Sequence, residues 1–148
     1  MHAKLVWQED GVRTFIVILE PGEEAFSALS AFAAANEVEA ASLTAIGAFE
    51  RATVGWFDLA RKSYRRIEIA QQCEALSLLG DIAQGDDGKP SLHMHAVLGL
   101  SDGTCRGGHF LEGLVHPTLE VTLLETPARL RRVKRPELGL ALIDLSRS

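Results

Sequence analysis

Residues 91–100, with the sequence SLHMHAVLGL, constrain the fold of this chain more than any other segment. Small or apolar residues alternate with histidine here, which is the period-2 pattern of a β-strand. Residues two apart on a strand point to the same face, about 6.6 Å apart along its axis, so His93 and His95 are expected to project side by side. Both imidazoles are long enough to reach one metal ion at about 2.0–2.1 Å.

The turn after this strand decides whether His109 joins the pair. Asp102-Gly103 is a strong hairpin signal. A two-residue loop would place Phe110 opposite His95 and turn His109 to the other face, because a one-residue slip inverts every side chain. A three-residue loop with the glycine left-handed would place His109 opposite His95. The two glycines at 107–108 could instead form a bulge that re-aims His109. We favour the register in which all three imidazoles share a face, since paired glycines beside a histidine indicate close backbone approach.

Three histidines on one face form the donor set of an open metal site, with a further position left for solvent. The competing interpretation is that His93, His95 and His109 are ordinary half-buried sheet residues. The choice between the two depends on the hairpin register.

Length and composition limit the class of protein. The 148 residues are expected to form a single domain over 1–148, large enough to bury a core without disulfides. Cys73 and Cys105 lie in apolar, strand-like runs and are expected to be reduced, which indicates a cytoplasmic protein. We find neither a signal-peptide pattern nor the roughly 18 apolar residues of a membrane helix. The net charge of −5 counts against a dedicated nucleic-acid binder without excluding a local basic patch.

One helix and seven or eight strands are expected along the chain. The helix covers 23–36, where Phe26, Leu29 and Phe32 recur at helical spacing. Strands are expected at 12–20, 49–58, 64–69, 74–83, 91–100, directly after the hairpin turn, 117–126 and, as a last short one, 138–145, while 41–47 is a short apolar segment that ends in glycine. Short turns between strands favour antiparallel pairing. The predicted fold class is therefore α+β, a mixed but mainly antiparallel sheet with the main helix packed on one face.

Two carboxylates are candidates for acid–base chemistry beside the histidines. Glu112 lies three residues beyond His109 and would face the other way on a regular strand. Glu120, in the next predicted strand, could support a histidine or act as a general base, and it is the candidate catalytic residue. The alternative is that both carboxylates are ordinary surface residues.

Two basic groups could face phosphates, one at 61–66 and one at 129–135. The second contains Arg129, Arg131, Arg132, Lys134 and Arg135. We favour a solvated strand edge, charged to block aggregation, over a nucleic-acid surface. The sequence contains neither a Gly-rich phosphate loop nor a nucleophile elbow.

Five stretches of the sequence, which include the histidine strand and the histidine after the hairpin, together resemble the plants-and-prokaryotes-conserved (PPC) domain family. The matching stretches are 74–82 (EALSLLGDI), 87–90 (DGKP), 93–95 (HMH), 107–113 (GGHFLEG) and 117–120 (PTLE). The His-x-His followed by Gly-Gly-His-Phe is the most specific part, and the resemblance spans roughly residues 12–146.

The resemblance implies a compact α+β domain that assembles as a homotrimer. It implies that His93, His95 and His109 are the metal ligands and that zinc is the usual ion. Plant members bind DNA through an AT-hook that precedes the domain, and the Arg-Gly-Arg-Pro core of that hook is missing here.

The leading expectation is a cytoplasmic homotrimer whose three-histidine site binds a small-molecule ligand or activates water. The alternative is a DNA-associated regulator that acts through a trimer-presented patch at 129–135. A cupin-type metalloenzyme ranks third, because residues 97–100 (VLGL) lack the Glu that cupins place shortly after the second histidine.

Overall fold

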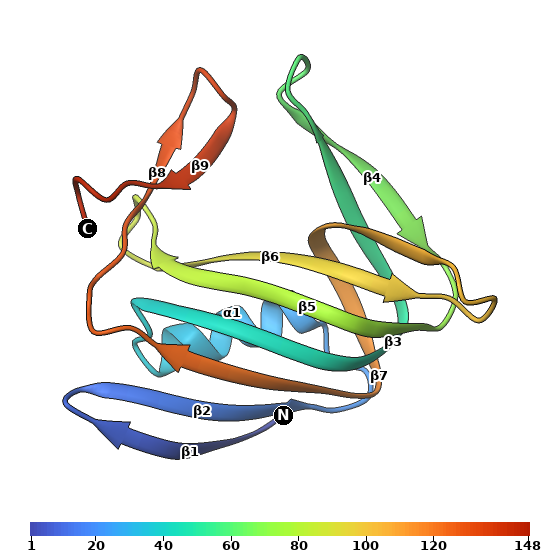
Figure 1. Ribbon diagram of the computed structural model, residues 1–148, viewed down its shortest axis with the longest axis horizontal. Coiled ribbons are helices and arrows are strands. Elements are labelled where there is room, and N and C mark those ends of the chain that lie inside the picture. The colour runs from blue at the N-terminus through green and yellow to red at the C-terminus, as the bar shows by residue number, and fades with distance from the viewer.

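A computed structural model describes residues 1–148 as nine strands and one helix (Figure 1). The strands are β1 (His2–Glu9), β2 (Val12–Leu19), β3 (Ala40–Asp58), β4 (Ser63–Ile69), β5 (Cys73–Gln84), β6 (Pro90–Gly99), β7 (Cys105–Glu125), β8 (Arg132–Arg135) and β9 (Leu140–Ile143), and the helix is α1 (Ala25–Ala35). The main sheet has the order β1-β2-β7-β6-β5-β3-β4, while β8 and β9 form a separate hairpin. All pairings between these strands are antiparallel, which confirms the predicted fold class.

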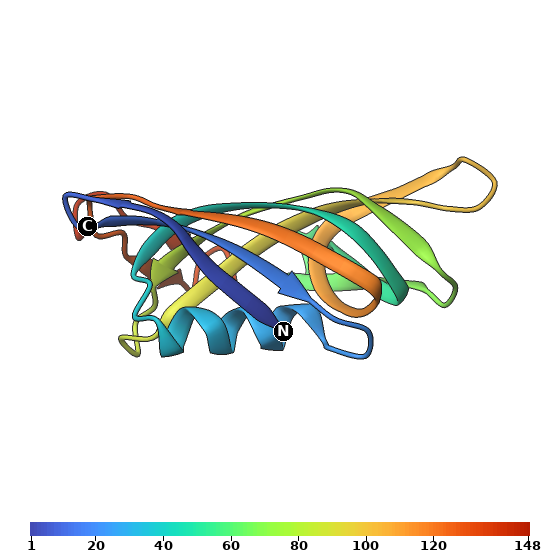
Figure 2. The same cartoon turned by 90° about the horizontal axis from the view of Figure 1, so that it is seen from below.

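Two long strands, β3 and β7, each belong to two parts of the sheet. The second half of β7 lies between β2 and the first half of β3, whereas its first half pairs with β6 and with the second half of β3. Where β3 crosses β7, Gly47 has φ +150° and a Cβ there would collide with the Thr118 carbonyl oxygen. The main sheet therefore curls into an arch (Figure 2). The predicted breaks before residue 49 and before residue 117 are register shifts within the continuous strands β3 and β7.

The helix covers the concave side of this arch (Figure 2). Glu24 caps its first turn by accepting the backbone N–H groups of Phe26 and Ser27, and Asn36 ends it, close to the predicted bounds. Phe32 is buried and meets Phe15 of β2 edge-on, with 5.3 Å between ring centroids. Burial of such apolar side chains against the sheet is the main force that holds the helix in place. The opposite face of the sheet carries the three histidines, with His93 and His95 on β6 and His109 on β7.

No helix in the structure has the length and apolar character needed to cross a membrane.

Candidate metal centre

The hairpin between β6 and β7 has the three-residue register that the sequence favours. His95 pairs with His109 across the two strands. The Leu100 N–H donates to the Thr104 carbonyl at 2.8 Å, and Gly103 has φ +82°, in the left-handed region that favours glycine. All three imidazoles consequently lie on one face, so the predicted register is confirmed.

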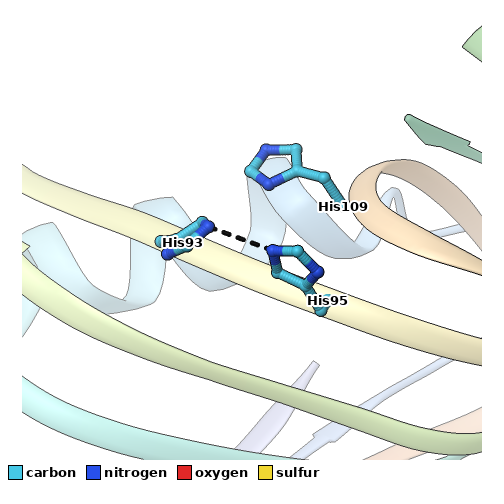
Figure 3. A group of neighbouring side chains, drawn as sticks. All are labelled: His93, His95 and His109. Atoms are coloured by element: carbon cyan, nitrogen blue, oxygen red, sulfur yellow. Dashed lines mark hydrogen bonds between the residues drawn. The ribbon is translucent and has the colours of Figure 1, made fainter. Parts of the chain in front are cut away.

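The three rings gather around a common point (Figure 3). One nitrogen from each of His93, His95 and His109 lies within 4.8 Å of the others. The Nε2 atoms of His93 and His95 are 3.2 Å apart. Two nitrogen ligands of a tetrahedral ion at about 2.0–2.1 Å stand roughly 3.3 Å apart. The spacing therefore matches a shared ion as well as a hydrogen bond between two imidazoles.

His109 carries the clearest sign that a ligand is needed. Its Nδ1 is buried and has no hydrogen-bond partner. Tyr64 stacks on the same imidazole, with 4.6 Å between ring centroids, and helps to exclude water. A buried polar atom left unpaired costs about 1–3 kcal/mol, so native proteins seldom leave one without a partner. A metal ion held by the three rings would satisfy this nitrogen, and the donor set fits such an ion.

Burial keeps two of these histidines in the neutral form that binds metals. Burial, together with the charges of His93, His95 and Arg132, lowers the pKa of His109 from its ordinary 6.5 to about 4. Burial and the nearby His93 lower the pKa of His95 as well. Both rings are therefore uncharged near neutral pH, with a lone pair free for coordination.

The metal-free protein is expected to lose stability as the pH falls from about 6.5 to about 4. In this range His109 binds a proton in the unfolded chain but stays neutral in the folded protein, so protonation favours unfolding. Each unit of pKa shift corresponds to about 1.36 kcal/mol, and partial solvation reduces the total effect to about 1–2 kcal/mol. Urea unfolding of chelator-treated protein at several pH values measures it. In His109→Gln this part of the pH dependence should disappear; an unchanged slope would contradict the assignment to His109.

Asp81 of β5 lies directly opposite His93 and supports it. One Asp81 carboxylate oxygen stands 3.7 Å from His93 Nδ1, while the other forms an ion pair with Arg132. Arg132 is only 5 % exposed and also donates to the Ser91 carbonyl at 2.6 Å. Burial alone would raise the pKa of the Asp81 carboxyl, but His93 and Arg132 outweigh it and hold that pKa below its ordinary value. The Asp81 carboxylate thus favours a proton on Nδ1 of His93 and leaves Nε2 free.

Glu120 lies elsewhere on the sheet. It is exposed on β7, opposite Ile46 of β3, and lines a separate hollow that includes none of the three histidines. With β3 and β5 between this part of β7 and β6, three strand spacings amount to roughly 14 Å. The structure therefore does not bring Glu120 to the histidines of its own chain, because the second half of β7 pairs with β2 and with the first half of β3, whereas β6 pairs with the first half of β7.

Glu112 is engaged in a different network. Its carboxylate accepts from Thr53 Oγ1 at 2.9 Å and pairs with Arg66 at 2.5 Å. It lines a pocket away from the histidines.

The basic run at 129–135 does not form a continuous charged surface. Arg132 is buried against Asp81, Arg129 pairs with Glu39 at 3.0 Å, and Arg135 pairs with Asp144 at 2.7 Å. The expectation of a wholly solvated strand edge is wrong for Arg132, because this side chain turns inward to neutralise Asp81. Sequence reasoning missed both members of this pair as site residues.

A family model described as the Plants and Prokaryotes Conserved (PCC) domain matches residues 8–127. Among solved structures, a Pyrococcus horikoshii plant- and prokaryote-conserved (PPC) protein is 32% identical, with 89% of this chain and 91% of that chain covered and a TM-score of 0.83. An Archaeoglobus fulgidus protein described as metal-containing is 28% identical over 97% of this chain and 99% of that chain, with a TM-score of 0.82.

A candidate DNA-binding protein from Bacteroides thetaiotaomicron is also 28% identical, over 90% of this chain and 92% of that chain, with a TM-score of 0.85. No curated protein matches the chain at a significant level.

Proposed function

The chain belongs to the Plants and Prokaryotes Conserved domain family, and we propose that it is a cytoplasmic homotrimer that holds a zinc ion between His93, His95 and His109. The observation that carries the metal proposal is the buried, unpartnered Nδ1 of His109 beside two imidazoles at ligand spacing. The metal-containing relative from Archaeoglobus fulgidus supports the same assignment. The free thiols of Cys73 and Cys105 support a reducing compartment.

The activity we propose is metal-dependent binding or conversion of a small molecule. A divalent ion supplies Lewis acidity, which polarises a bound ligand and activates water near neutral pH. The chain supplies the rest: two neutral imidazoles, a third oriented by Asp81, and a Tyr64 ring that shields one side of the site. Three protein ligands leave a coordination position open, as catalytic zinc sites do.

Zinc reconstitution tests the metal proposal. Chelator-treated protein is expected to take up about one zinc per chain and to become more stable, because zinc binds the folded arrangement of donors and not the unfolded chain. Free zinc a hundredfold above its Kd should add about 2.7 kcal/mol, or roughly 5–10 °C in Tm. Mg²⁺ is the matched control, since it prefers oxygen ligands and should give no shift. Binding well below one zinc per chain would overturn the proposal.

The outer face of the sheet supports self-association. Ile46, Leu76, Leu79 and Val97 form an outer apolar patch on β3, β5 and β6, and Ile46 is 62 % exposed. Large exposed side chains grouped on one face mark an interaction surface. We place the homotrimer contact on this patch.

Ile46→Glu is expected to convert the trimer to monomers, because three buried and unpaired carboxylates would cost far more than the lost apolar contacts. Light scattering coupled to size-exclusion chromatography measures the mass, which should fall from three chains to one. Leu59→Glu, in the exposed turn after β3, is the control and should leave the trimer intact. A wild-type monomer, or a trimeric Ile46→Glu, would contradict this interface.

DNA association remains the alternative, and the candidate DNA-binding relative from Bacteroides thetaiotaomicron is in its favour. The ion pairs of Arg129, Arg132 and Arg135 weaken the charge that the 129–135 patch could offer to phosphates. We therefore rank it below the metal proposal.

A further inference from the structure

A cavity of about 670 Å³ adjoins the three histidines and lies between two hairpins. In Figure 1 the β3–β4 and β8–β9 hairpins both extend beyond β6, toward the top of the view. Lys62 Nζ, from the turn of the first hairpin, lies 3.5 Å from the Pro136 carbonyl of the second. The histidine face of β6 and β7 closes a third side. A volume of this size suits a small organic molecule.

The two side walls of this cavity are apolar but differ in kind. On one side Tyr64 stacks on His109, and Phe57 meets Tyr64 edge-on with 5.0 Å between ring centroids. On the other side β9 contributes Leu140 and Leu142, and Leu142 is 40 % exposed. An aromatic wall facing an aliphatic wall favours a ligand with a flat or apolar body.

The cavity offers a ligand almost no free charge. None of its lining residues is acidic, so a cationic ligand would find no counter-charge. Arg132 is the one lining residue with a permanent positive charge, and its guanidinium is already bound to Asp81 and Ser91. A polyphosphate needs several free cations and would be poorly matched. The charge that is left is that of a divalent ion at the histidines, whose one open coordination position suits a ligand with a single anionic head group.

We propose that this cavity takes a small monoanionic organic acid with an aromatic or apolar body. Its head group lies at the histidine-held ion, and its body lies between Tyr64 and Leu142. This inference rests on the proposed metal centre. The family match ends at residue 127, before β8 and β9, so the aliphatic wall lies outside the matched region. Selectivity for the ligand body is thereby assigned to the C-terminal hairpin.

Two hydroxamates test the proposal on the zinc-loaded full chain. Benzohydroxamate and acetohydroxamate share a chelating head group and differ in the phenyl ring, so calorimetric titration of both separates the body from the head. We expect benzohydroxamate to bind about tenfold tighter or more, because the ring removes apolar surface from water. Equal affinities in protein that holds zinc would overturn this inference and leave the metal centre standing. A protein that holds no zinc would overturn both.

Variants of the C-terminal hairpin locate the ligand body. Leu142→Ser is expected to remove most of the preference for the phenyl ring while the Kd for zinc stays at the wild-type value. Leu145→Ser is the matched control, because Leu145 is 77 % exposed and does not line the cavity. A phenyl preference that persists in Leu142→Ser would overturn the assigned wall.

Discussion

Replacing His93 and His95 together with alanine is expected to abolish zinc binding by the chain. Zinc held by a full set of protein ligands is bound by about 10–16 kcal/mol, or roughly 3 kcal/mol per ligand. Loss of two ligands should therefore cost about 6 kcal/mol, a decrease in affinity of roughly 10⁴-fold. Mass spectrometry of dialysed protein would show metal content falling from about one ion per chain to nearly none.

The control for this variant is a histidine on β7, the strand that pairs with β6. His116 is exposed on β7 and does not belong to the cluster, so His116→Ala should retain the zinc of the wild type. Circular dichroism of both variants shows whether the sheet is preserved. If the His93/His95 variant were folded and still carried one zinc per chain, the ion would have to be held elsewhere, and the three-histidine assignment would fail.

The histidine cluster was predictable because the information that forms it is local. Alternation places His93 and His95 on one face, and the Asp102-Gly103 turn sets the register that brings His109 opposite them. All of these residues lie within one hairpin. A hairpin depends little on the rest of the chain, so its geometry can be read from its own sequence.

The long strands could not be predicted in the same way. Near Gly47 and again near residues 112–116 the alternation is interrupted, and an interruption is equally consistent with a turn or a bulge. The pairing of β3 with β7 decides between the two, and these strands are distant in the sequence. The position of Glu120 on the sheet depends on the same long-range pairing. β1 was missed for another reason: all of its residues are exposed, so it has no buried face to give it a pattern.

The contact of Asp81 and Arg132 behind His93 also could not be predicted from neighbouring residues in the sequence. Asp81 and Arg132 are 51 residues apart, and they meet because β5 pairs with β6 while the C-terminal hairpin folds back. The sequence signals for Asp81 are its place in the 74–82 stretch and its neighbour Gly80, where a Cβ would collide with the His93 carbonyl oxygen. Such close approach of β5 to the histidine strand marks Asp81 as a neighbour of the site. Nothing distinguishes Arg132 from the other cations of its run, since only the fold buries it.

Asp81→Asn is expected to weaken zinc binding by about 10–100-fold without changing the stoichiometry at saturation. Loss of a carboxylate behind a metal-bound histidine typically has an effect of this size. Asparagine keeps the shape of the side chain but removes the charge that favours a proton on His93 Nδ1, so the Nε2 lone pair is less available to the ion. A competition titration with a chromophoric chelator measures the change in Kd.

Asp81 also neutralises the buried Arg132, so a stability effect has to be separated from an effect on the site. Glu74→Gln provides the matched control, since it removes one negative charge from an exposed position on the same strand and should leave the Kd for zinc unchanged. Nitrogen NMR of the metal-free protein reports the His93 tautomer directly, and Asp81→Asn should increase the population with the proton on Nε2. If Asp81→Asn lowered Tm but changed neither the tautomer nor the Kd, Asp81 would serve only to neutralise Arg132, and the ring of His93 would be oriented by the strand alone.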